Sequence, residues 1–192
     1  MLGELIEKYL FKERHVFSYT LVKAPNDGGV LIFTPGQYLE RIDEVKTIGR
    51  LPRLCEVRQH SDSWVLFVCE EDSEVLGYSF LHIPSRTEWN DSLPTHPGEA
   101  RASSSFVAPS KRGMGIRGRL MQAQRDYCLH NDKRMWAVIE KRNLSSNRST
   151  SKNGGQLQSK NFLLKCLGHN VASIVVKPAR LYLLLGSRRA RR

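Results

Sequence analysis

The chain has 192 residues, a formal net charge of +11 at pH 7 and a pI near 9.8. This length suits one globular domain with a substantial core, and no apolar run approaches the roughly 20 residues that cross a bilayer. The first residues lack the features of a secretory signal, so we expect a cytoplasmic protein that does not associate with membranes.

The cysteines and histidines follow no metal-binding pattern. Cys55, Cys69, Cys128 and Cys166 are scattered without Cys-x-x-Cys spacing, which predicts buried free thiols and no disulfide framework. The histidines show no His-x-x-x-His spacing, so we expect no metal. The excess of positive charge indicates an anionic partner, and the basic residues 187–192 predict a solvated tail.

The N-terminal part of the chain predicts an extension that precedes the main domain elements. Apolar residues recur at helical spacing over residues 2–12, and residues 15–24 alternate as a strand. A turn at 25–29 ends this extension. The following residues predict a strand at 30–34, a helix at 35–48 and a short helix at 51–60.

The middle of the chain predicts strands. Residues 63–71 and 74–83 are β-rich runs that predict an antiparallel hairpin. A polar connection over 84–97 leads to a strand at 98–107. A helix over 118–128 and a short buried strand over 134–140 follow. Two strands at 170–176 and 180–185 predict a closing hairpin.

The turn between the strand at 98–107 and the next helix is the most informative segment. Gly113 and Gly115 let backbone N–H groups approach an anion closely, and the helix adds its free N–H groups and the positive end of its dipole. This combination predicts a pyrophosphate site. We expect it to involve Lys111, Arg112, Gly113, Met114, Gly115, Ile116, Arg117 and Gly118.

Residues 112–117 resemble the acyl-CoA loop of the GCN5-related N-acetyltransferases (GNAT), whose pattern is Gln/Arg-x-x-Gly-x-Gly/Ala. Arg112 and Gly115 fill the first two fixed positions, and Arg117 stands where the family prefers Gly or Ala. The resemblance covers roughly residues 30–185. It implies an α+β (α/β) fold: a mixed, mostly antiparallel sheet with a splayed, V-shaped cleft, flanked by helices. We expect one domain over 1–186, with 1–29 as its extension.

Two registers fit the last core helix of this family. In the first, Asn143 and Ser146 match the family's Asn-x-x-Ala/Ser, and Gly154 ends the helix. In the second, residues 141–155 form an enlarged loop and the helix spans 159–168. We favour the second because that helix has an apolar stripe, whereas the first register would bury almost nothing.

The resemblance implies transfer of an acetyl or other acyl group from acyl-CoA to an amine by direct attack. Backbone near Phe106 and Val107 would hold the thioester oxyanion, and a general base would deprotonate the amine. Glu99 is the first candidate base and Glu140 the second. The family's usual Tyr acid is replaced by Leu164 in the favoured register and by Thr150 in the other, so another Tyr (Tyr78, Tyr127 or Tyr182) or solvent must protonate the thiolate.

The acceptor is a small-molecule or peptide amine of unspecified identity. We expect Tyr38, Arg86 and Trp89 to contact it, the last two from a segment over the cleft. Two alternatives stay open: a transferase that takes its acyl group from acyl carrier protein, and an inactive acyl-CoA-sensing or nucleic-acid-binding module, both suited to a basic surface. Either a monomer or a homodimer is compatible with the sequence.

Overall fold

The computed structural model describes residues 11–21, 29–34, 37–49, 62–90, 92–166 and 169–184. Nine strands form one sheet in the order β11-β10-β9-β1-β8-β7-β4-β3-β2, and every neighbouring pair is antiparallel except β7 and β8. The strands are β1 (Phe11–Tyr19), β2 (Val30–Phe33), β3 (Trp64–Glu71), β4 (Glu74–His82), β7 (Glu99–Val107), β8 (Arg134–Glu140), β9 (Gly155–Cys166), β10 (His169–Val175) and β11 (Arg180–Leu183).

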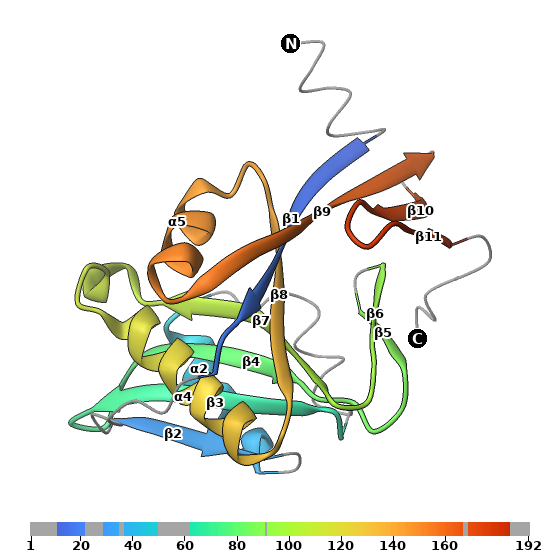
Figure 1. Ribbon diagram of the computed structural model, residues 1–192. Helices are drawn as coiled ribbons and strands as arrows, with labels where there is room; N and C mark the ends of the chain where they lie inside the picture. Colours follow the sequence, from blue (N-terminus) through green and yellow to red (C-terminus); the bar gives the residue numbers. More distant parts are fainter. Residues whose placement is uncertain are drawn as a thin grey trace.

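Helices cover both faces of this sheet (Figure 1). They are α2 (Tyr38–Thr47), α4 (Ile116–His130) and α5 (Leu144–Lys152), and a second small sheet pairs β5 (Glu88–Asn90) with β6 (Leu93–Thr95). This arrangement confirms the predicted mixed, mostly antiparallel sheet flanked by helices. None of the helices in the described residues is long and apolar enough to cross a membrane.

The core lies on both sides of β3 and β4, because alternate side chains of a strand point to opposite faces. Phe67 packs against α4 through Leu120 on one face. Leu66 packs with Val45 of α2 on the other face. All four are fully buried, and burying each such apolar side chain stabilises the fold by about 1.5–3 kcal/mol.

The pair β7 and β8 diverges along its length, which produces the predicted V shape. The two strands pair only from Glu99 with Arg134 to Ala102 with Ala137. Beyond these residues β7 continues to Val107 beside β4, and β8 continues to Glu140 beside β1. The edge of β7 that faces β8 therefore has no strand partner beyond Ala102 among the described elements.

A β-bulge lies in β7 where the divergence begins. Phe80 of β4 pairs with Ser103, but Tyr78 pairs with Phe106, so β7 carries one extra residue in this interval. Ser104 lies within it with φ 46, a conformation that few non-glycine residues adopt. Such bulges bend a strand and redirect its side chains. The bulge begins where the pairing of β7 with β8 ends at Ala102.

The structure of the C-terminal part of the chain contradicts the register that we favoured for the last core helix. The polar residues 144–152 form α5, and residues 155–166, expected to be loop and helix, form the strand β9. The first register is therefore the right one, and Thr150 stands four residues before Gly154.

The physical reason is that β9 gains more from pairing with its neighbouring strands than it would from burying the apolar stripe of the predicted helix. Residues along β9 pair with β1 on one side and with β10 on the other, which satisfies their backbone groups. Helix α5 is polar and mostly exposed, and it is held instead by an N-cap: the Asn143 side chain accepts a hydrogen bond from the Ser146 N–H. The apolar surface that a segment could bury therefore did not identify which segment forms the last core helix.

Other predictions fare differently. The hairpin β3–β4, the helix α4 and the hairpin β10–β11 are confirmed near the predicted bounds. The first strand starts at Phe11, before the expected position, so the predicted helix over 2–12 does not include its last two residues. The rest of that helix, the turn at 25–28, the helix at 51–60 and the tail at 187–192 lie outside the described residues. Cys69 and Cys128 are buried free thiols, whereas Cys166 is exposed.

Candidate active site

The predicted phosphate turn follows the end of β7 and is open to solvent at its glycines. Gly113 and Gly115 adopt left-handed conformations with φ 84 and 77, and a Cβ added at either position would meet no atom within 4 Å. Gly115 is the N-cap of α4, and its carbonyl accepts bonds from the N–H groups of Gly118 and Arg119. The N–H groups of Ile116 and Arg117 precede the first intrahelical bonds, so they are available to an anion.

Cations surround this turn, and no acidic residue lies in the first turn of α4. Lys111 is 2.7 Å from Glu74 and Arg119 is 2.6 Å from Glu71, so both are positioned by exposed partners. The Arg112 guanidinium lies 5.8 Å from the centroid of the Phe106 ring. Met114 is 58% exposed at the tip. The structure thus brings these predicted donor-binding residues together in one continuous turn.

Arg117 differs from its neighbours because its side chain turns inward. Burial lowers the pKa of its guanidinium, and a smaller electrostatic effect of Tyr19 on β1 opposes this. Its Nε has no hydrogen-bond partner. The residue that departs from the family pattern therefore does not crowd the glycine turn.

Tyr19 is a residue that the sequence reasoning missed. It is 6% exposed, and its hydroxyl faces that of the fully buried Thr150 on α5, although the two make no well-aligned hydrogen bond. Burial raises the pKa of Tyr19, so its phenol stays protonated at neutral pH. Only the long-range pairing of β1 beside β9 brings this tyrosine to the interface of α4 and α5, and no local pattern signals that.

The two predicted bases lie at opposite ends of the V. Glu99 begins β7 at the closed end, where its carboxylate accepts a bond from the His96 N–H at 3.0 Å and lies 3.5 Å from Arg134. Glu140 ends β8 at the open end. The structure therefore does not bring Glu99 and Glu140 together.

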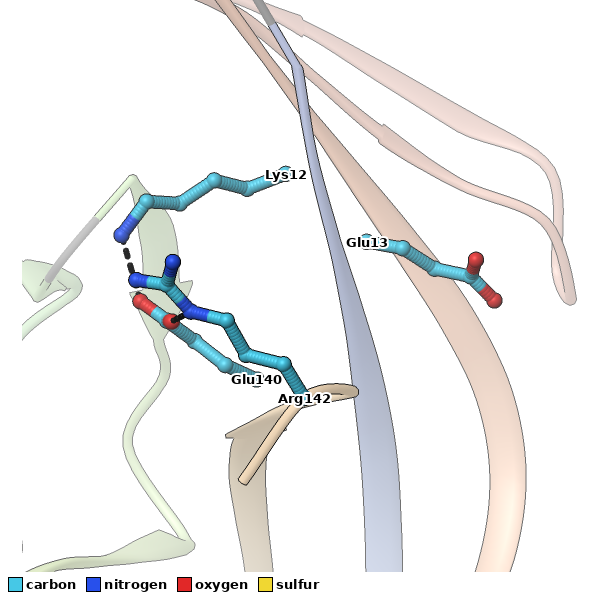
Figure 2. Close-up of a pocket in the computed structure, with 4 residues that line it drawn as sticks. All are labelled: Lys12, Glu13, Glu140 and Arg142. Atoms are coloured by element: carbon cyan, nitrogen blue, oxygen red, sulfur yellow. Dashed lines mark hydrogen bonds and ion pairs between the residues drawn. The ribbon is translucent and has the colours of Figure 1, made fainter. Parts of the chain in front are cut away.

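Glu140 is held by two cations. Lys12 lies 2.5 Å from one carboxylate oxygen and Arg142 lies 2.7 Å from the other (Figure 2). Burial raises the pKa of Glu140, but the bonds from Lys12 and Arg142 outweigh it, so the pKa is below its usual value. Glu13 extends from the other side of β1 in the same view, toward Lys141 and Lys160.

The α2 side of the V carries a network of buried polar groups. Arg101 of β7 donates to the Asn90 carbonyl and lies 5.2 Å from the Trp136 ring centroid. His82 stacks on Trp64 with a centroid distance of 4.3 Å and lies 2.9 Å from Glu88. This network attaches the β5–β6 hairpin to the end of the sheet.

Two of the three predicted acceptor-binding residues lie at or beside the β5–β6 hairpin. Arg86 is exposed just before the β5–β6 hairpin, and Trp89 is 55% exposed on β5. The Trp89 ring meets the Tyr182 ring of β11 edge-on at 5.5 Å. Asn170 of β10 also donates to Ser92 at 2.8 Å. The hairpin is thus connected to the C-terminal strands, as Figure 1 shows, and the Tyr38 side chain lies outside the described part of the chain.

These features match a known family. Residues 35–154, more than half of the chain, match the family model of the Acetyltransferase (GNAT) family. The chain belongs to the GNAT family. The matched segment includes the glycine turn, the diverging strands and α5, so the resemblance predicted from the loop is confirmed. No curated protein sequence matches the chain.

Solved structures of GNAT proteins share the fold. A protein from Novosphingobium aromaticivorans, described as a GNAT acetyltransferase, superposes with a TM-score of 0.60 at 11% identity, covering 79% of this chain and 62% of its own. A GNAT acetyltransferase from Colwellia psychrerythraea gives 0.59 at 12% identity, covering 85% and 60%. An aminoglycoside N-acetyltransferase in complex with CoA gives 0.52 at 18% identity, covering 72% and 94%.

The chain thus spans less than two thirds of the length of the first two structures. Across the residues that the structure describes, no group of three or more His, Cys, Asp or Glu side chains is arranged to hold a metal ion.

Proposed function

We propose that this GNAT protein is an N-acyltransferase that moves an acetyl or other acyl group from acyl-CoA to an amine by direct attack. The observation that carries the proposal is the open turn from Arg112 to Gly115, which leads into α4 beside the divergence of β7 and β8. The turn offers N–H donors and cations to a pyrophosphate. The edge of β7 beyond Ala102 offers unpaired backbone groups to the rest of the donor.

The unpaired edge of β7 would orient the thioester. Backbone groups near Phe106 and Val107 lie beyond the last residues that pair with β8, so they can bond to the donor as a neighbouring strand would. An N–H there would stabilise the oxyanion that develops when the amine attacks the carbonyl carbon. The C–S bond then breaks and CoA leaves as a thiolate.

The amine must lose a proton, and Glu99 is the proposed base. Its place at the closed end of the V, seven residues before Phe106, requires a relay of water molecules between carboxylate and amine. Glu140 is the weaker candidate because Lys12 and Arg142 hold both of its oxygens and lower its pKa. For the departing thiolate, Tyr19 is a proposed proton donor, since it lies beside Thr150, where the GNAT resemblance implies a tyrosine. Arg86, Trp89 and Tyr38 are proposed contacts of the acceptor.

Two measurements test this proposal together: calorimetry with acetyl-CoA, and release of free thiol in the presence of a panel of amines. We expect binding of acetyl-CoA and amine-dependent thiol release. A Glu99→Gln variant should bind the donor normally and release thiol more slowly, whereas Glu99→Asp should retain part of the rate. Absence of heat with acetyl-CoA would refute the donor site, and an unchanged rate in Glu99→Gln would remove Glu99 as the base.

A specific observation also favours a second candidate, a non-catalytic acyl-CoA sensor. Thr150 cannot protonate a thiolate as tyrosine does, and Tyr19 is largely buried. Tight binding of acetyl-CoA without turnover of any amine would support this candidate. Turnover of an acyl carrier protein donor, with none of acetyl-CoA, would instead support the carrier-protein alternative.

A further inference from the structure

The C-terminal arm of the sheet, formed by β9, β10 and β11 beside the start of β1, carries two apolar rows. Directly paired residues of neighbouring strands point to the same face of a sheet. The ladders align Phe11, Leu164, Ala172 and Leu183 in one row and Phe162, Ile174 and Leu181 in the next. The rings of Phe11 and Phe162 stack at 5.2 Å, so both rows lie on one face of the arm.

This apolar face is open to solvent. Leu181 is 62% exposed and Leu183 is 67% exposed. The β5–β6 hairpin contacts the opposite face, because Trp89 meets the ring of Tyr182, which lies between the two leucines in β11. In Figure 1 the arm extends past α5, the helix beside β9. A group of exposed aliphatic side chains of this kind is typical of a contact surface for another protein or for a membrane.

The charges around the apolar face are almost all positive. Residues 141–192 contain 12 lysines and arginines and no aspartate or glutamate, so the whole positive excess of the chain lies in this part. Glu13 is the single carboxylate among β1, α5, β9, β10 and β11, and Lys141 and Lys160 bind it at 2.7 and 3.4 Å. The group around Glu140 extends from the other side of β1 (Figure 2).

Two further cations near the apolar face have no carboxylate partner. Arg148 lies on α5 and Lys177 follows β10, and both are exposed. Neither forms an ion pair with any residue in the described part of the chain. Helix α5 lies on the side of the apolar rows, because Asn147 is 2.8 Å from His15, which shares a face of β1 with Phe11. These cations are therefore available to an anionic partner.

From the exposed aliphatic rows and the one-sided charge we infer that the C-terminal arm binds the surface of a membrane that contains anionic lipids. The leucines would enter the boundary between headgroups and acyl chains, while the cations contact the headgroup phosphates. A second copy of the chain is a poorer partner, because it would bring like charges together. Nucleic acid gains little from aliphatic side chains, since its bases stack on aromatic rings.

The sequence after β11 adds to this surface. Residues 188–192 contain four arginines, and a polybasic segment strengthens a membrane contact that is weak when it is only apolar. The inference goes beyond acyl transfer and does not depend on it. It departs from our expectation that the chain does not associate with membranes, which rested on the absence of a long apolar run. The apolar rows come from four separate strands, so no such run signals them.

Co-sedimentation of the full chain with vesicles tests the inference. We compare phosphatidylcholine vesicles with vesicles in which about a quarter of the lipid is phosphatidylglycerol, and we expect binding to the second kind. The double variant Leu181→Gln/Leu183→Gln should weaken this binding about tenfold or more, because it removes exposed apolar groups that the membrane would bury. Leu31→Gln/Ile32→Gln is the matched control, since both residues are 41% exposed on β2 at the other edge of the sheet.

A second pair of double variants tests the charges. Arg148→Gln/Lys177→Gln should weaken binding to the anionic vesicles about 25-fold, because each cation near an anionic surface contributes roughly fivefold. Lys46→Gln/Lys133→Gln removes the same charge from α2 and from the residues after α4, so it should have a much smaller effect. Thermal unfolding and acetyl-CoA binding should match the wild type in all four variants.

The outcomes separate this inference from its alternatives. Absence of binding, equal binding to neutral vesicles, or equal losses in the control variants would overturn it. A loss with the charge variant but not with the leucine variant would indicate general attraction of a basic protein and would also overturn it. A dimer that the leucine variant abolishes would assign the face to a second copy, and tighter binding to single-stranded RNA than to vesicles would assign it to nucleic acid. None of these results would affect the proposed acyl transfer, which acetyl-CoA turnover tests separately.

Discussion

Substitution of Gly115 gives the sharpest test of the donor site. We compare Gly115→Asp with Gly115→Asn, which have nearly the same shape and differ by one negative charge. Both are compatible with the left-handed conformation at φ 77, since Asn and Asp tolerate it better than other residues. A Cβ at this position meets nothing within 4 Å, so neither side chain clashes with the fold.

The expected magnitude follows from Coulomb's law. Two unit charges 4 Å apart interact by about 4 kcal/mol at an effective dielectric constant of 20 and by about 1 kcal/mol in water. The turn is exposed, so the aspartate should repel the pyrophosphate by roughly 1–4 kcal/mol. This corresponds to about 5-fold to 1000-fold weaker binding of acetyl-CoA than in Gly115→Asn.

Calorimetry at low and at high salt measures this difference, which should shrink as salt screens the charges. Thermal unfolding is the control. A negative side chain at the start of α4 interacts favourably with the helix dipole, so Gly115→Asp should be at least as stable as Gly115→Asn. Equal affinities of the two variants for acetyl-CoA at low salt would refute the assignment of this turn to the pyrophosphate.

Three further predictions concern the surroundings of the turn. Tyr19→Phe should lower kcat about tenfold to hundredfold without changing acetyl-CoA affinity or stability, as steady-state kinetics and a thermal melt can measure; an unchanged kcat would leave protonation to solvent. Gly77→Ala should reduce the free energy of unfolding by about 1–3 kcal/mol, because its Cβ would lie 2.9 Å from the Phe106 carbonyl oxygen; urea unfolding checks this, and wild-type stability would contradict it. The bond from Lys141 lowers the pKa of Glu13 despite its burial. The stabilisation from Glu13 should therefore be present above its unfolded pKa near 4.3 and be lost as pH falls through the lower folded value, so wild type should lose more stability than Glu13→Gln between pH 7 and pH 3.

The features that the sequence predicted well are those set by neighbouring residues. The Asp72–Ser73 turn between two β-rich runs predicts the β3–β4 hairpin, and both residues adopt positive φ there. Gly113 and Gly115 predict the turn before α4 for the same reason, since only particular residues accept those conformations. Local backbone chemistry suffices for such elements.

Where a feature depends on residues far apart in the chain, the prediction was wrong or the feature was missed. The stripe from Phe162 to Cys166 has helical spacing, but β1 and β10 flank it and make it a strand. The buried side chain of Arg117 lies within electrostatic reach of Tyr19, which is almost a hundred residues earlier in the chain. The ion pairs around Glu140 join β1 to the end of β8 in the same way. Motif spacing carries no signal for these contacts.

The short ladder between β7 and β8 has a mechanical consequence. Four residues on each strand, from Glu99 to Ala102 and from Arg134 to Ala137, form the β-pairing between the two halves of the nine-stranded sheet. A donor bound along the unpaired edge would add hydrogen bonds to this short ladder, because it would bond to one strand while its phosphates bind the start of α4. The co-substrate would then stabilise the association of the two parts of the sheet as well as supply the acyl group. Both parts should exchange their amide hydrogens more slowly when it is bound.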